Sequence, residues 1–137
     1  MQDPRPVVAD IEFVADVLRL LGYQADVTTL SGGGQGLTSL ASGVPFTAFL
    51  FKNDVGNSPY LMLSVLLPGH QPPLAQMNEW NNRFPMTRAS LTREGEPMLT
   101  HAVLLTGIDT SHIRETMQWW DLLVRLFAQK ILGEPGA

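Results

Sequence analysis

The sequence predicts an α+β fold in which an antiparallel sheet of about five strands packs against three helices. Segments typical of strands follow one another in neighbouring groups, and helical segments stand before, between and after them, in the order α-β-β-β-α-β-β-α. Strands that are neighbours in sequence pair antiparallel through short turns, whereas a parallel sheet needs a helix in each crossover. The 137 residues, 45% of them apolar, suffice for one core, so we expect one domain over residues 1–137.

The first helix is expected between Val8 and Leu21, because apolar residues recur there at helical spacing. Gly22 can adopt the left-handed conformation that ends a helix. The chain is then extended from Gln24 to Leu30, where β-branched residues favour a pleated backbone. The helix positions that carry the apolar pattern are Ile11, Val14, Leu18 and Leu21.

The glycine-rich segment from Ser31 to Gly36 invites comparison with a phosphate-binding loop. It lacks the Gly-Lys-Ser/Thr ending and the spacing of the nucleotide-binding motifs. We interpret it as a hairpin turn whose glycines supply positive φ angles, with a return strand from Gly36 to Ala41.

Two further strands are expected, from Val44 to Lys52 and from Tyr60 to Leu67. Both carry apolar side chains on each face, so another surface should cover part of the second face of the sheet. Phe49 and Phe51 alternate with Phe46 on the first of these strands, and we predict that they bind a partner.

The second helix is expected to open at Pro72-Pro73 and to end before Pro85. Its apolar face also carries Asn81, and an unpaired amide there would cost about 1–3 kcal/mol. We expect Asn81 to hydrogen-bond the backbone near the following strand rather than to recognise a partner. The apolar face consists of Leu74, Met77, Trp80 and Phe84.

A second strand pair is expected from Met86 to Thr92 and from Met98 to Thr106, followed by a long helix from an Asp109 N-cap to about Leu132. This helix carries two apolar stripes, and adjacent side chains on a helix point about 100° apart. The stripe with Trp120 is expected to face the core. The second stripe, predicted to bind another subunit or partner, consists of Trp119, Leu122 and Leu126.

No catalytic or metal-binding constellation is predicted. His112 and Glu115 lie near the start of the last helix but need further ligands, and we interpret Asp109 as its N-cap. His101 alternates with apolar residues, which is typical of a hydrogen-bonded core or edge histidine. The chain contains no cysteine, and no nucleophile elbow surrounds its serines. We therefore expect no cofactor, no bound metal and no enzymatic activity.

The net charge of −4 with scattered arginines argues against nucleic-acid binding. The longest apolar stretches are far shorter than the roughly 20 residues that span a bilayer, and the N-terminus has no apolar signal core. These features favour a cytoplasmic protein without a membrane partner.

Residues Met77 to Phe127 carry a diffuse pattern of packing residues that resembles the YbjN family of bacterial sensory transduction regulators. The resemblance implies a type III secretion chaperone-like fold, a single YbjN-like domain, and a regulatory or protein-binding role without transferable catalytic residues. The residues that carry it are Trp80-Asn81, Arg83-Phe84, Arg88-Ala89, Gly95, Leu104-Leu105, Gly107, Trp120 and Phe127.

The leading hypothesis is thus a noncatalytic protein-interaction module that acts as a regulator or chaperone-like adaptor and forms a homodimer. One alternative is a small-molecule sensor whose pocket is lined by Phe49, Phe51, Trp80 and Trp119. A less favoured alternative is an enzyme, which would need a pocket that joins His101 or His112 to two carboxylates.

Overall fold

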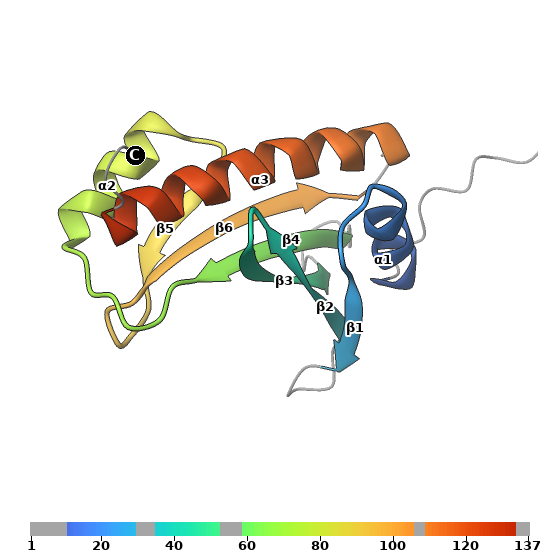
Figure 1. The fold of residues 1–137 in the computed structure, drawn as a ribbon, viewed down its shortest axis with the longest axis horizontal. Helices are drawn as coiled ribbons and strands as arrows, with labels where there is room; N and C mark the ends of the chain where they lie inside the picture. The colour runs from blue at the N-terminus through green and yellow to red at the C-terminus, as the bar shows by residue number, and fades with distance from the viewer. Residues whose placement is uncertain (1–10, 30–34, 53–58, 106–108, 134–137) are drawn as a thin grey trace, which may run out of the picture.

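The computed structural model describes residues 11–29, 35–52, 59–105 and 109–133, and of residues 51, 52 and 59 the backbone only. In these residues, four consecutive strands follow the first helix and two follow the second, as in an α+β chain (Figure 1). The elements are α1 (Ile11–Leu20), β1 (Asp26–Thr29), β2 (Gln35–Ala41), β3 (Val44–Lys52), β4 (Pro59–Leu66), α2 (Leu74–Arg83), β5 (Arg88–Leu91), β6 (Pro97–Leu104) and α3 (Thr110–Leu132).

The six strands form one sheet in the order β1-β2-β3-β4-β6-β5, and every neighbouring pair is antiparallel. This confirms the predicted α+β class with three helices, and the sheet has one strand more than the five or so expected. The short β1 lies within the segment expected to be extended from Gln24 to Leu30, and it pairs with β2 from Asp26↔Thr38 to Thr29↔Gln35. The glycine-rich residues 31–34, interpreted above as a turn, lie outside the described residues.

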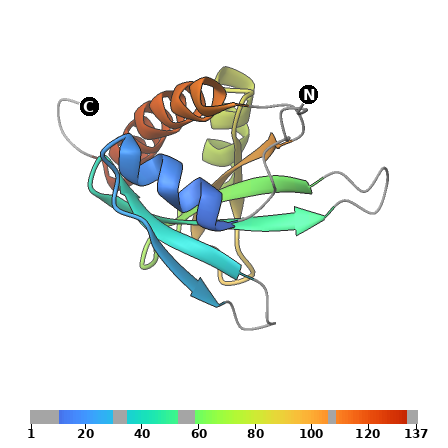
Figure 2. The same cartoon turned by 90° about the vertical axis from the view of Figure 1, so that its right-hand side faces the viewer.

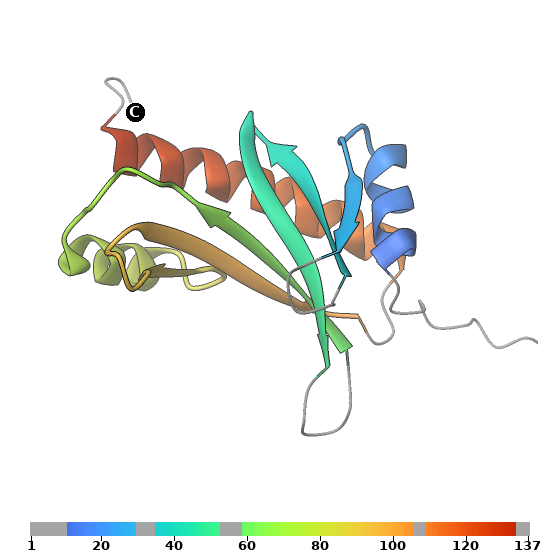
Figure 3. The same ribbon diagram turned by 90° about the horizontal axis from the view of Figure 1, so that it is seen from below.

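The helices α1 and α3 lie on the same face of the sheet. Figure 2 shows α1 and α3 across the strands, and Figure 3, seen from below, shows strands in front of α3 with no described helix covering them. The helix α2 packs on the edge strand β5 and beside α3. The sheet therefore has one face buried under helices and one face open among the described elements.

The core lies between this helix layer and the sheet. Trp120, which is fully buried, meets Phe46 of β3 edge to face, with ring centroids 5.8 Å apart. Trp80 of α2 meets Phe127 of α3 in the same way at 5.1 Å. The predicted inner stripe of α3 is thus confirmed, and its buried members are Ile113, Met117, Trp120, Val124 and Phe127, with Ile131 partly buried.

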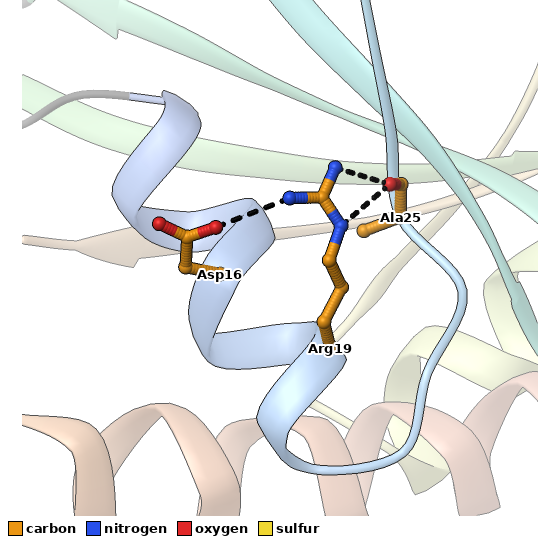
Figure 4. A network of polar contacts seen from close by, with 3 residues as sticks. All are labelled: Asp16, Arg19 and Ala25. Atoms are coloured by element: carbon orange, nitrogen blue, oxygen red, sulfur yellow. Dashed lines mark hydrogen bonds and ion pairs between the residues drawn. The ribbon is translucent and has the colours of Figure 1, made fainter.

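Hydrogen bonds from Arg19 link α1 to the residue that precedes β1 (Figure 4). Gly22, with φ +95°, reverses the chain after the helix and brings Ala25 back beside it. The Arg19 guanidinium donates from Nε and Nη2 to the Ala25 carbonyl oxygen at 3.1 and 2.7 Å, and from Nη1 to Asp16 at 3.1 Å. This geometry positions the short strand β1 against β2.

Asn81 and Trp80 fasten α2 to β5. The Asn81 side-chain amide accepts a hydrogen bond from the Ala89 N–H at 2.7 Å and donates to the Ala89 carbonyl at 2.9 Å. This confirms that Asn81 hydrogen-bonds backbone where helix passes to strand. Trp80 Nε1 donates to the Thr87 hydroxyl at 2.9 Å. One expectation for this helix was wrong: Leu74 is 59% exposed, because it is the first residue of α2 and the packed turns begin with Met77.

Both ends of α3 lie at the predicted positions. The Asp109 carboxylate accepts a hydrogen bond from the His112 N–H at 2.9 Å, which makes Asp109 the N-cap. Gly133 ends the helix in the left-handed conformation at φ +68°. Within the part of the chain that the structure describes, no helix, α3 included, combines the length and apolarity needed to cross a membrane.

Candidate partner-binding surfaces

The exposed side of α3 carries the predicted second stripe. Trp119 is 47% exposed, although it directly precedes the fully buried Trp120. Leu122 is half-buried, and Leu126 is half-buried and packs against the core. Of the three predicted partner-binding residues on α3, Trp119 therefore presents the most free apolar surface, and Leu126 contributes partly to the fold.

An open groove of about 690 Å³ lies between this side of α3 and the C-terminal half of β6. Apolar side chains with unusually high exposure border it, since Met86 is 50% and Leu104 62% exposed. Trp119 therefore shares this hollow with two other exposed apolar side chains. We call this hollow the Trp119 groove, and its lining residues are Met86, His101, Ala102, Val103, Leu104, His112, Glu115, Thr116 and Trp119.

A second hollow, of about 490 Å³, lies beside the C-terminal half of α3. Its cationic groups are Arg83, whose guanidinium lies 5.5 Å from the centre of the Phe84 ring, and Lys130, which pairs with Glu79 at 3.4 Å. Each residue of α3 that lines the Trp119 groove has a counterpart in the second hollow fourteen positions later, which is about four helical turns, so both hollows open on the same side of the helix. The lining residues are Trp80, Arg83, Phe84, Leu126, Gln129, Lys130 and Gly133.

Phe49 lies on a different surface. The strand register pairs Phe49 with Met62 on the sheet face opposite the helices, and the backbone of Phe51 pairs with that of Tyr60. The side chain of Phe51 lies outside the described residues. Of the predicted partner-binding residues whose side chains are described, Trp119, Leu122 and Leu126 thus lie on α3, and Phe49 lies on the open face of the sheet.

The structure does not bring Phe49, Trp80 and Trp119 together in the single pocket that the alternative sensor hypothesis requires. Trp80 is buried under the helices, bonded to Thr87, whereas Phe49 lies on the opposite face of the sheet. Trp119 borders its own groove on the outer side of α3. Phe49 lies on a strand and the two tryptophans lie on different helices, so only the tertiary arrangement of these elements shows the separation.

Two histidines and one carboxylate line the Trp119 groove: His101, His112 and Glu115. His101 Nδ1 donates to the Met86 carbonyl oxygen at 2.7 Å, so the prediction of a hydrogen-bonded histidine is confirmed. The Asp109 carboxylate is used as the helix cap. Among the residues that the structure describes, no three histidine, cysteine or acidic side chains gather closely enough to hold a metal ion.

Sequence reasoning did not identify Met86 and Leu104 as part of this surface. The position of Leu104 could have been predicted from the alternation of side chains along a strand. It lies an even number of residues from Met98, Thr100 and Ala102 and therefore shares the outer face of β6 with them. The position of Met86 could not have been predicted in this way, since only the turn that follows α2 brings it beside Trp119.

Comparison with known proteins identifies the family. A family model described as "Putative bacterial sensory transduction regulator", YbjN, matches residues 10–132. No curated protein matches the chain. The family is described as a regulator and not as an enzyme. Because the match covers nearly the whole sequence, including every element from α1 to α3, this chain belongs to the YbjN family.

Proposed function

We propose that this chain is a noncatalytic protein-interaction module that acts as a bacterial regulator or chaperone-like adaptor and binds another protein or peptide. Membership of a family of described regulators supports a regulatory role. The acidic net charge of −4 supports a protein partner over a nucleic acid. The proposal places the module in the cytoplasm as a single domain.

The observation that carries this proposal is the Trp119 groove. Trp119, Met86 and Leu104 each expose about half of their surface or more, and they border one hollow together. Tryptophan and methionine are enriched in protein interfaces, where a large aromatic side chain in a central hollow contributes much of the binding energy. A partner that covers this groove would remove their apolar surface from water.

The open face of the sheet is the proposed homodimer surface. Its side chains on β3, β4 and β6 include Phe49, Met62 and Met98, and no described helix covers them. The proposal also keeps Phe51, which the sequence predicts to bind a partner.

The proposal is tested by affinity capture from a lysate of the native bacterium, with the full chain as bait and bound proteins quantified by mass spectrometry. Trp119→Ser should lose partners that the wild-type chain retains reproducibly. Leu20→Ser is the matched control, because Leu20 is 83% exposed at the end of α1, away from the groove. Partners retained equally by both variants, or none retained by the wild-type chain, would contradict the proposal.

A further inference from the structure

The strand β6 is paired on both sides along only half of its length. On one side it pairs with β4 from Met98 to Leu104. On the other side β5 pairs with it only from Pro97 to Thr100, because β5 begins at Arg88. Beyond Thr100, no described strand continues on the β5 side, and that side opens into the Trp119 groove.

The hydrogen bonds around β5 and β6 identify which main-chain groups face the open side. Asn81 bonds both the N–H and the C=O group of Ala89, so these two groups point away from β6. The N–H and C=O groups of its neighbours in β5 therefore point toward Met98 and Thr100 of β6. The Pro97 carbonyl accepts from the Leu67 N–H on the β4 side. Successive residues of a strand alternate in this direction, so the N–H and C=O groups of Ala102 and Leu104 face the groove.

The free main-chain groups of β5 and those of the C-terminal half of β6 differ in whether a side chain bonds them. At β5 the Asn81 amide occupies the free edge. At Ala102 and Leu104 no described residue outside the β4 ladder bonds the main chain. Unpaired edge groups beside an apolar groove are the arrangement to which an extended peptide adds as a further strand.

We infer that an extended segment of the partner protein adds antiparallel to β6 opposite residues 101–104, in line with β5. This inference rests on the proposed function and specifies how the partner binds. Four residues at about 3.4 Å each span about 14 Å. Residues opposite Ala102 and Leu104 can exchange up to four main-chain hydrogen bonds, and the residues opposite Val103 and His101 point toward α3.

The charge of the groove indicates which side chains the partner segment carries. Glu115 lines the groove and forms no ion pair with any described side chain. A lysine or arginine among the inward residues would compensate this carboxylate, and an aliphatic or aromatic one would pack on Trp119. The structure therefore favours a strand-forming segment whose inward side chains combine a basic and an apolar residue.

The test uses a random nine-residue peptide library displayed on phage, selected on the full chain, with the enriched peptides then synthesised for affinity measurement. Ala102→Pro removes a main-chain donor that faces the groove and leaves the β4 ladder intact, since proline is tolerated at an open edge. It should weaken peptide binding about tenfold or more. Ala102→Val changes the same side chain but keeps the donor, so it should lose much less affinity than Ala102→Pro.

A second measurement holds even if Ala102→Pro fails to fold. Methylation of individual peptide nitrogens should abolish binding at every second position and spare the positions between, because alternate residues face β6. On binding, amide hydrogen exchange at Ala102 and Leu104 should slow. Selection of no peptide, or affinity indifferent to every N-methyl group, would overturn strand addition, as would doubling of the chain's mass through this edge in place of peptide binding.

Failure of this inference is distinguishable from failure of the proposed function. If Trp119→Ser loses its captured partners while Ala102→Pro retains them, the groove binds a partner by another mode and strand addition is wrong. If folded Trp119→Ser and Ala102→Pro both retain them, the proposed function of the groove is wrong as well.

Discussion

Trp119 and Trp120 are adjacent in sequence and occupy opposite environments. Trp120 is fully buried against Phe46, and its indole N–H has no acceptor in the described chain, so packing rather than hydrogen bonding stabilises it. We expect Trp120→Ala to lower the free energy of unfolding by about 3–5 kcal/mol. Trp119→Ala should lower it by less than about 1 kcal/mol. Urea denaturation followed by circular dichroism measures both, and equal losses would contradict the two-stripe description of α3.

Tyr23 gives the fold a dependence on alkaline pH. Burial raises the pKa of its hydroxyl above 10, and the Asp121 carboxylate raises it further. The hydroxyl donates to the Met117 carbonyl oxygen at 3.5 Å. Since the folded pKa exceeds the unfolded one, this contribution to stability is complete below about pH 10 and declines as pH rises through the folded value.

The corresponding measurement compares the wild-type chain with Tyr23→Phe in urea between about pH 8 and pH 11. The wild-type free energy of unfolding should fall more steeply above pH 10, because its unfolded state releases a proton that the folded state retains. Asp121→Asn should bring the pKa of Tyr23 closer to its usual value in a spectrophotometric titration. Parallel pH profiles for wild type and Tyr23→Phe would contradict the assignment.

Individual site residues were predictable to different degrees. The helical period was sufficient to separate Trp119 from Trp120, because it depends only on spacing along one element. The period did not indicate that Leu126 packs against the core, since that depends on the position of α2. The inclusion of Met86 in the groove likewise depends on tertiary contacts that no local pattern encodes.

At the scale of elements, Asn81 protects the edge of β5. We expect Asn81→Ala to cost about 1–3 kcal/mol of stability, because it leaves both main-chain groups of Ala89 without their partner. Asn82→Ala is the matched control: Asn82 is exposed on the same helix, and its loss should be within about 0.5 kcal/mol. Thermal unfolding measures the difference, and amide exchange at Ala89 should accelerate only in the first variant. Identical melting of the two variants would refute this role.

The order of elements was largely readable from the sequence because apolar periodicity and turn residues are local signals. The second helix, the two later strands and the Asp109 cap lie close to their expected positions. The partial pairing of β6 was not readable. It depends on β5 beginning at Arg88, after a turn held by Trp80 and Thr87, and therefore on contacts between elements.

At the scale of the whole molecule, the open sheet face leads to a prediction about assembly. Light scattering should give a mass near twice the 15.1 kDa of one chain. Phe49→Lys places a charge on this face and should return the mass to that of a monomer without changing the circular dichroism spectrum. Leu74→Lys, at an exposed position on α2, should remain dimeric. A monomeric wild-type chain, or a Phe49→Lys variant that stays dimeric, would contradict the proposed dimer surface.

The central claim is that another polypeptide occupies the Trp119 groove in the cell, and photo-crosslinking tests it most directly. The photoreactive amino acid p-benzoylphenylalanine is placed at Trp119 in one variant and at the exposed Leu20 in another, and both are irradiated in living bacteria. A covalent adduct with a second polypeptide should form from position 119 and not from position 20. No adduct from position 119, or the same adducts from both positions, would contradict the claim.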